Sequence, residues 1–143
     1  MRRTKNRALA LVLTILCVWS FSLQTVTATD EYPIEPYYIG LAQVTVSLDI
    51  NDTALESLAN CFTFVRLYDG YSADVTLNLQ RSTDKSNWTT IKSWEDSGEG
   101  QIEISKNYFV NTEYYHRVGV LIYVYYENGN VAEIITKYSP IRP

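Results

Sequence analysis

The fold of this chain is decided by the stretch YYHRVGVLIYVYY, residues 114–126. Four branched aliphatic residues occupy alternate positions in it: Val118, Val120, Ile122 and Val124. Successive side chains of a β-strand point to opposite faces of a sheet, so this spacing predicts a long strand with one buried face. Tyr123 and Tyr125 belong to the other set of positions, which would face away from the core.

Similar runs predict six further strands, at residues 43–50, 60–67, 74–80, 88–94, 102–104 and 131–138. Residues 96–100 read as a loop, and residues 54–59 have room for one helical turn at most. Asn128-Gly129 predicts a tight hairpin whose two central residues both take positive φ. Short alternating strands at regular spacing predict an all-β fold, a single immunoglobulin/fibronectin type III-like sandwich of about seven antiparallel strands.

The first 28 residues have the three parts of a secretory signal peptide. Basic residues gather in positions 1–7, an apolar run spans 8–23, and Ala28 precedes the expected cleavage point. The run has 16 residues, fewer than the about 20 that a membrane span needs, so we expect cleavage rather than a retained anchor. The predicted organisation is a signal peptide at 1–28, an extended lead-in at 29–38 and a secreted, extracellular β-sandwich domain at 39–143.

Charge and cysteine content exclude several classes of function. Loss of residues 1–28 would leave 16 acids and eight bases, a net charge of −8. Binding to nucleic acid or to an anionic membrane needs clustered lysine and arginine, so we expect neither partner. Only Cys61 of the two cysteines would remain, which excludes a disulfide scaffold and favours a bacterial source.

Two resemblances add to this reading. Residues 114–120 (YYHRVGV) resemble the sixth strand of fibronectin type III domains, in which a tyrosine opens the strand and apolar residues follow at alternate positions. That resemblance implies a tyrosine-corner role for Tyr114, whose hydroxyl would bond to upstream backbone. His116 departs from the pattern, because an aromatic or apolar residue is usual there.

A wider similarity is carried by LQRS at 79–82, WTTIKSW at 88–94, YYHRVGV at 114–120 and TKYS at 136–139. In this order the segments resemble a family of small secreted β-sandwich proteins from Gram-positive gut bacteria. The resemblance implies export and fold, and it implies no activity or site residue.

Residues suited to catalysis or metal binding form no constellation in the sequence. His116 has the parity of the core, and Cys61 lies in an apolar strand where cysteine acts as a small buried hydrophobe. The acids around residues 95–103 match no calcium motif, and a carboxylate pair for glycoside hydrolysis would need a cleft. We therefore predict a non-enzymatic protein with no catalytic residue, no metal and no cofactor.

An aromatic surface is the remaining candidate site. Five residues are predicted to form it: Trp88, Trp94, Leu121, Tyr123 and Tyr125. The two tryptophans have the parity opposite to Ile91, so both would face outward if Ile91 is in the core, and Gly119 would leave room for a partner.

Tyrosine and tryptophan combine an apolar face with a polar tip, which suits binding of an unidentified protein or glycan. Binding or adhesion outside the cell or at its surface is the first hypothesis, and a carbohydrate-binding module using the aromatic face is the alternative. A third reading makes these aromatics only cross-strand pairs that stabilise the sheet.

Overall fold

The computed structural model describes residues 37–52 and 56–143 of the chain. Within this part the backbone forms seven antiparallel strands in two sheets, which confirms the predicted all-β sandwich. The predicted signal peptide, residues 1–28, and residues 29–36 of the predicted lead-in lie outside the described residues.

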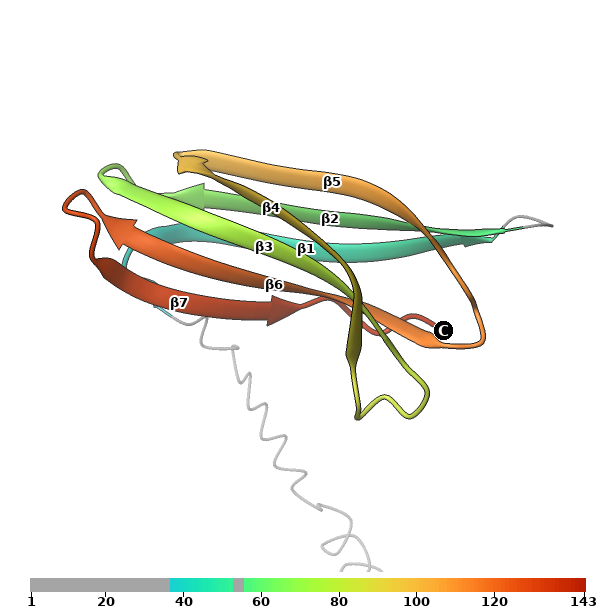
Figure 1. The fold of residues 1–143 in the computed structure, drawn as a ribbon. Helices are drawn as coiled ribbons and strands as arrows, with labels where there is room; N and C mark the ends of the chain where they lie inside the picture. The colour runs from blue at the N-terminus through green and yellow to red at the C-terminus, as the bar shows by residue number, and fades with distance from the viewer. Residues whose placement is uncertain (1–36, 53–55) are drawn as a thin grey trace, which may run out of the picture. The chain divides into compact units, whose positions relative to one another are not determined.

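The strands divide into a three-stranded and a four-stranded sheet, which lie face to face in Figure 1. The first has the order β1-β2-β5 and the second the order β4-β3-β6-β7. The bounds are β1 Leu41–Asp52, β2 Ser57–Leu67, β3 Tyr71–Ser82, β4 Thr89–Glu99, β5 Gln101–Val110, β6 Tyr115–Tyr126 and β7 Val131–Tyr138.

The core lies between the sheets and is built from the alternation that the sequence shows. In β6 the aliphatic residues at 118, 120, 122 and 124 are fully buried, as predicted, and they pair with the buried set of β3. From the other sheet β2 contributes Cys61 and Val65, and β1 contributes Leu48. Each fully buried aliphatic side chain stabilises the fold by about 1.5–3 kcal/mol, so these central strands hold the sandwich together.

Two local predictions are wrong, and a third segment takes a different structure from the one considered. The predicted loop at 96–100 is mostly strand, because β4 continues to Glu99, and the strand predicted at 102–104 is the ten-residue β5. Most side chains of residues 105–110 are exposed, so they carry no hydrophobic alternation, and their backbone is fixed by pairing with β2 instead. Residues 57–59, placed in a possible helical turn, already belong to β2.

The hairpin between β6 and β7 forms at the predicted place with a different turn. Only Gly129 of the predicted pair has positive φ, at 80°. The Gly129 amide donates to the Tyr126 carbonyl at 2.9 Å, and the Asn130 amide donates to the Asn128 side chain at 3.0 Å. A type I turn followed by a left-handed residue is the usual geometry of such three-residue hairpin loops, and glycine adopts that conformation without strain.

A carboxylate joins the two sheets at the start of β1. Glu133 lies on β7, and its Oε1 accepts hydrogen bonds from the amides of Gly40 and Leu41 at 2.8 and 3.1 Å. Its Oε2 accepts a third from the Ile39 amide at 3.2 Å. These amides precede or begin the first strand, so one side chain satisfies donors that no neighbouring strand pairs.

Candidate binding face

The outer face of the four-stranded sheet carries the predicted tyrosines. Leu121, Tyr123 and Tyr125 alternate with the buried residues of β6, so all three point away from the core as predicted. Tyr123 is 36 % exposed, whereas Leu121 and Tyr125 are half-buried by their neighbours. The predicted parity of β6 is confirmed.

Strand β7 extends this surface. Ile134 lies opposite Tyr123, and Val131 lies opposite Tyr125, so each shares the outer face with its partner. Ile134 is 57 % exposed and Val131 is 49 % exposed. We call the five residues Leu121, Tyr123, Tyr125, Val131 and Ile134 the β6–β7 strip.

Val131 and Ile134 were not among the surface residues predicted from the sequence. A bulge in β7 places both Ala132 and Glu133 against Val124, so the outward positions of β7 do not follow a single parity. The signal available in the sequence was the Asn128-Gly129 hairpin, which fixes β7 beside the outward tyrosines of β6.

A depression of about 650 Å³ borders the β6–β7 strip on the side of β3 and β4. Its lining includes Tyr123 and Tyr125 of β6, Asp74 and Thr76 of β3, and Glu95 and Asp96 of β4. Asp74 lies directly opposite Tyr123, and Glu95 lies opposite Thr76, because the three strands are in continuous antiparallel register. Two phenol rings and the carboxylates of Asp74 and Glu95 therefore share one open concavity on the outer face.

One hydrogen bond links two side chains that line this depression, Tyr125 and Asp74. The Tyr125 hydroxyl donates to Asp74 Oδ2 at 3.0 Å. This hydrogen bond raises the pKa of Tyr125, because ionisation would remove the proton that the hydroxyl donates to Asp74. The hydrogen bond ties the end of the Tyr125 side chain to the neighbouring strand β3.

The other end of the outer face is filled by the protein's own side chains. The Arg117 guanidinium carbon lies 4.2 Å from the Trp88 ring centroid and 4.0 Å from the Tyr138 ring centroid. Arg117 Nε also donates to Gln80 Oε1 at 2.8 Å. We call this group, Trp88, Arg117, Tyr138 and Gln80, the arginine stack.

Gly119 does not leave room for a partner, contrary to the sequence-based expectation. A Cβ at this position would lie 2.8 Å from Cε1 of Tyr138, which shows that the Tyr138 ring lies directly on the glycine. Tyr138 pairs with Gly119 across the β6–β7 ladder, so the space is taken by an intramolecular aromatic ring.

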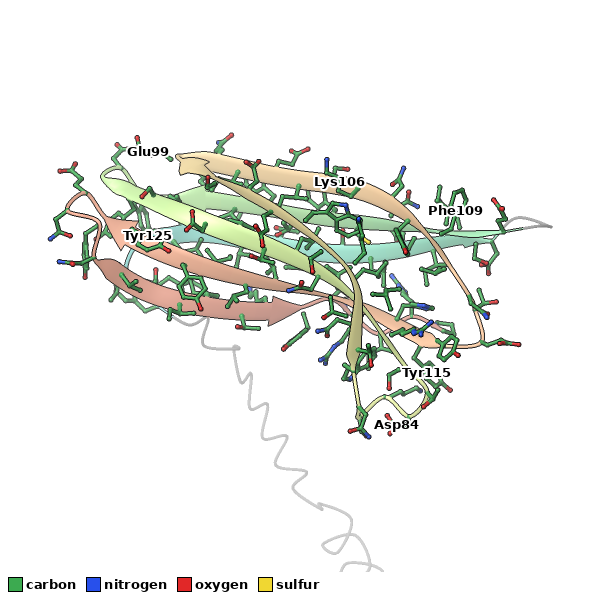
Figure 2. All side chains as sticks on the ribbon, in the orientation of Figure 1. Asp84, Glu99, Lys106, Phe109, Tyr115 and Tyr125 are labelled. Atoms are coloured by element: carbon green, nitrogen blue, oxygen red, sulfur yellow. The ribbon has the colours of Figure 1, made fainter. Side chains whose placement is uncertain are left out.

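Trp88 faces outward as predicted, but its indole ring is already in contact with other residues of the protein. Its indole Nε1 donates to the Lys85 carbonyl at 3.1 Å, and Arg117 covers its ring. The loop that carries it is fixed by Asp84, which accepts hydrogen bonds from the amides of Ser86 and Asn87 at 2.8 and 2.7 Å. These donors hold the pKa of Asp84 well below its usual range. Figure 2 shows Asp84 in this loop, at the far end of the sheet from Tyr125.

Trp94 faces inward, so the prediction that both tryptophans share the outer face is wrong. Strand β4 has a bulge in which both Ile91 and Lys92 lie opposite Leu79. Beyond this bulge the inward-facing and outward-facing positions of β4 exchange. Trp94 therefore pairs with the buried Leu77 and packs against the core. Its ring meets Tyr108 of the other sheet edge-on, with centroids 6.4 Å apart.

The cysteine, the histidine and the tyrosine singled out from the sequence lie within the packed structure. Burial raises the pKa of the Cys61 thiol to about 12, and His116 is 1 % exposed with no hydrogen-bond partner for Nδ1. Tyr114 precedes β6, and the Arg81 guanidinium lies 4.7 Å above its ring. Within the described residues its hydroxyl makes no tyrosine-corner hydrogen bond.

Two further features concern the part of the chain that the structure describes, residues 37–52 and 56–143. It contains no group of three or more histidine, cysteine, aspartate or glutamate side chains able to hold a metal ion. It also contains no helix long and apolar enough to cross a membrane.

The acids considered from the sequence lie on different elements. Glu95 and Asp96 line the depression, Glu99 ends β4, and Glu103 lies on β5 in the opposite sheet.

Comparison of the chain with protein-family models and with curated proteins gives no match.

Proposed function

We propose that this chain is an exported, non-enzymatic domain that binds another molecule outside the cell or at the cell surface. The observation that carries the proposal is the β6–β7 strip, where Tyr123, Val131 and Ile134 are exposed side by side on one sheet face. Adjacent exposed apolar side chains on a soluble domain are typical of an interaction site. The signal-peptide pattern at 1–28 supports export, and the similarity to secreted proteins of Gram-positive bacteria supports a bacterial source.

We also assign the sandwich to the immunoglobulin and fibronectin type III kind. The support is the division of seven strands into sheets of three and four, with β6 and β7 beside β3. Strand β4 pairs with β3, whereas in constant-type immunoglobulin domains the fourth strand joins the first, second and fifth. Among the described residues, no strand lies over the outer face of β3, β6 and β7.

A protein ligand fits this face better than a glycan does. A carbohydrate-binding module would need flat aromatic rings open to solvent. Arg117 covers the Trp88 ring, and Trp94 packs against the core. The exposed side chains of β7 in the strip are aliphatic, so they offer neither a stacking plane nor a hydrogen bond to a sugar.

A panel of immobilised extracellular proteins and glycans tests the proposal. The purified protein should bind at least one member, and Tyr123→Ser with Tyr125→Ser should abolish that binding and leave the fold intact. Phe109→Ser is the matched control, because Phe109 is 64 % exposed on β5 of the other sheet (Figure 2). A silent panel, or loss of binding only in Phe109→Ser, would overturn the proposal, and turnover of any panel member would identify an enzyme instead.

A further inference from the structure

The β6–β7 strip and the depression beside it differ sharply in character. Across the β6–β7 ladder the outward residues are aliphatic or aromatic, with Tyr123 opposite Ile134. Across the β3–β6 ladder Tyr123 lies opposite Asp74, so the apolar strip changes to an acidic surface within one strand spacing. Glu95 on β4, opposite Thr76, continues that acidic surface.

No cation of residues 37–52 and 56–143 forms an ion pair with the carboxylates of the depression. Within the same residues, Asp74 accepts a hydrogen bond from the Tyr125 hydroxyl alone, and Asp96 accepts one from the Ser97 amide at 2.9 Å. Arg117, the outward-facing cation of β6, is held between Trp88 and Tyr138 by its own contacts. The depression therefore carries negative charge that an arriving cation would neutralise.

We propose that the ligand is a protein segment that presents a lysine or arginine beside an apolar side chain. This inference rests on the proposed function and names the chemistry of its ligand. The cation would enter the depression between Asp74 and Glu95, with its alkyl stem along Tyr123. The neighbouring apolar side chain would pack on Ile134 and Val131 of the strip.

Three physical effects make this partner the best fit. A cation over a tyrosine face is attracted by the ring quadrupole, and the adjacent carboxylates add direct charge attraction. Lysine and arginine also carry apolar stems that can cover hydrophobic surface. Such a stem would pack on the neighbouring apolar side chains of Tyr123 and Ile134. Charge complementarity of this kind governs association rate and specificity, so binding should weaken as salt rises.

The test is a titration of the purified protein with three probes, followed by fluorescence anisotropy or calorimetry. The first is a five-residue peptide of alternating lysine and leucine, the second its glutamate and leucine counterpart, and the third cellohexaose. The lysine peptide should bind, and Asp74→Asn with Glu95→Gln should weaken it about tenfold through loss of charge-assisted contacts. Asp69→Asn with Glu103→Gln removes the same charge elsewhere, at two exposed positions, and should change the affinity less than twofold.

The control pair distinguishes a site from general attraction to an acidic protein. Equal weakening in both double variants, or equal affinity for the glutamate peptide, would overturn the inference. Binding of cellohexaose that Tyr123→Ser abolishes would also overturn it, while the proposed function would stand. Failure of the lysine peptide to bind overturns the inference as well. The proposed function is overturned only if no member of the panel of extracellular proteins and glycans binds either.

Discussion

The arginine stack supports a prediction about stability that can be worked from its contacts. Replacing Arg117 by methionine keeps an unbranched stem between Trp88 and Tyr138 but removes the charge and the hydrogen-bond donors. Two cation–π contacts are lost, each worth about 0.5–1 kcal/mol at a partly exposed site. The 2.8 Å bond from Nε to Gln80 is also lost, and a hydrogen bond to a charged group contributes about 1.5–3 kcal/mol.

These terms are not additive, because the methionine side chain restores part of the packing and Gln80 regains water. We therefore expect Arg117→Met to lower the free energy of unfolding by about 2 kcal/mol, which for a domain of about 100 residues lowers Tm by about 8–16 °C. Arg117→Lys keeps the charge but loses the planar fork, and its cost should be about half as large.

Urea denaturation followed by tryptophan fluorescence measures the effect, because Trp88 belongs to the stack. Arg66→Met is the matched control, since Arg66 is exposed on β2 of the other sheet and should change stability by less than about 0.5 kcal/mol. If Arg117→Met costs no more than Arg66→Met, the stack does not stabilise this end of the face.

Three further predictions concern groups away from the stack. Burial, followed by the Arg81 charge, lowers the pKa of His116 below 6.5. Below that pH the unfolded chain binds a proton at His116 more readily than the folded chain does, so the free energy of unfolding should fall as pH drops below about 6.5. Urea denaturation at pH 7.5 and 5 should show a smaller loss of stability for His116→Gln than for the wild type. Because burial raises the pKa of Cys61 to about 12, a thiol reagent at pH 8 should label it only in denaturant, and rapid labelling of the folded protein would refute its burial. Glu133→Ala should lower the free energy of unfolding by about 2 kcal/mol, because it removes the acceptor of three amides at the start of β1. Glu127→Ala in the hairpin loop should change stability little, and equal shifts in Tm for the two variants would contradict the role of Glu133.

The elements that could be predicted from the sequence are those in which one face is buried along the whole strand. Strand β6 is the clearest case, because its alternation from Val118 to Val124 fixes both the core and the outward positions of Tyr123 and Tyr125. The same pattern in β3 predicts a strand with one buried face, whereas its pairing with β6 is known only from the structure.

The parts that could not be predicted depend on long-range contacts. The parity of β4 reverses at a bulge that forms opposite Leu79, so the orientation of Trp94 is not visible in the sequence of β4 alone. The length of β5 comes from pairing with β2 rather than from its own side chains. The occupation of Gly119 by Tyr138 depends on the register of β7, which the hairpin and its bulge set together.

We propose that ligand binding takes place on the outer face of β6 and β7. Amide and side-chain chemical-shift mapping by NMR, with a ligand that the panel identifies, measures this directly. Binding there should perturb signals centred on Tyr123, Tyr125 and Ile134 and extending to Asp74. Perturbations confined to the outward-facing Phe62 and Phe64 of β2, on the opposite sheet, would contradict it.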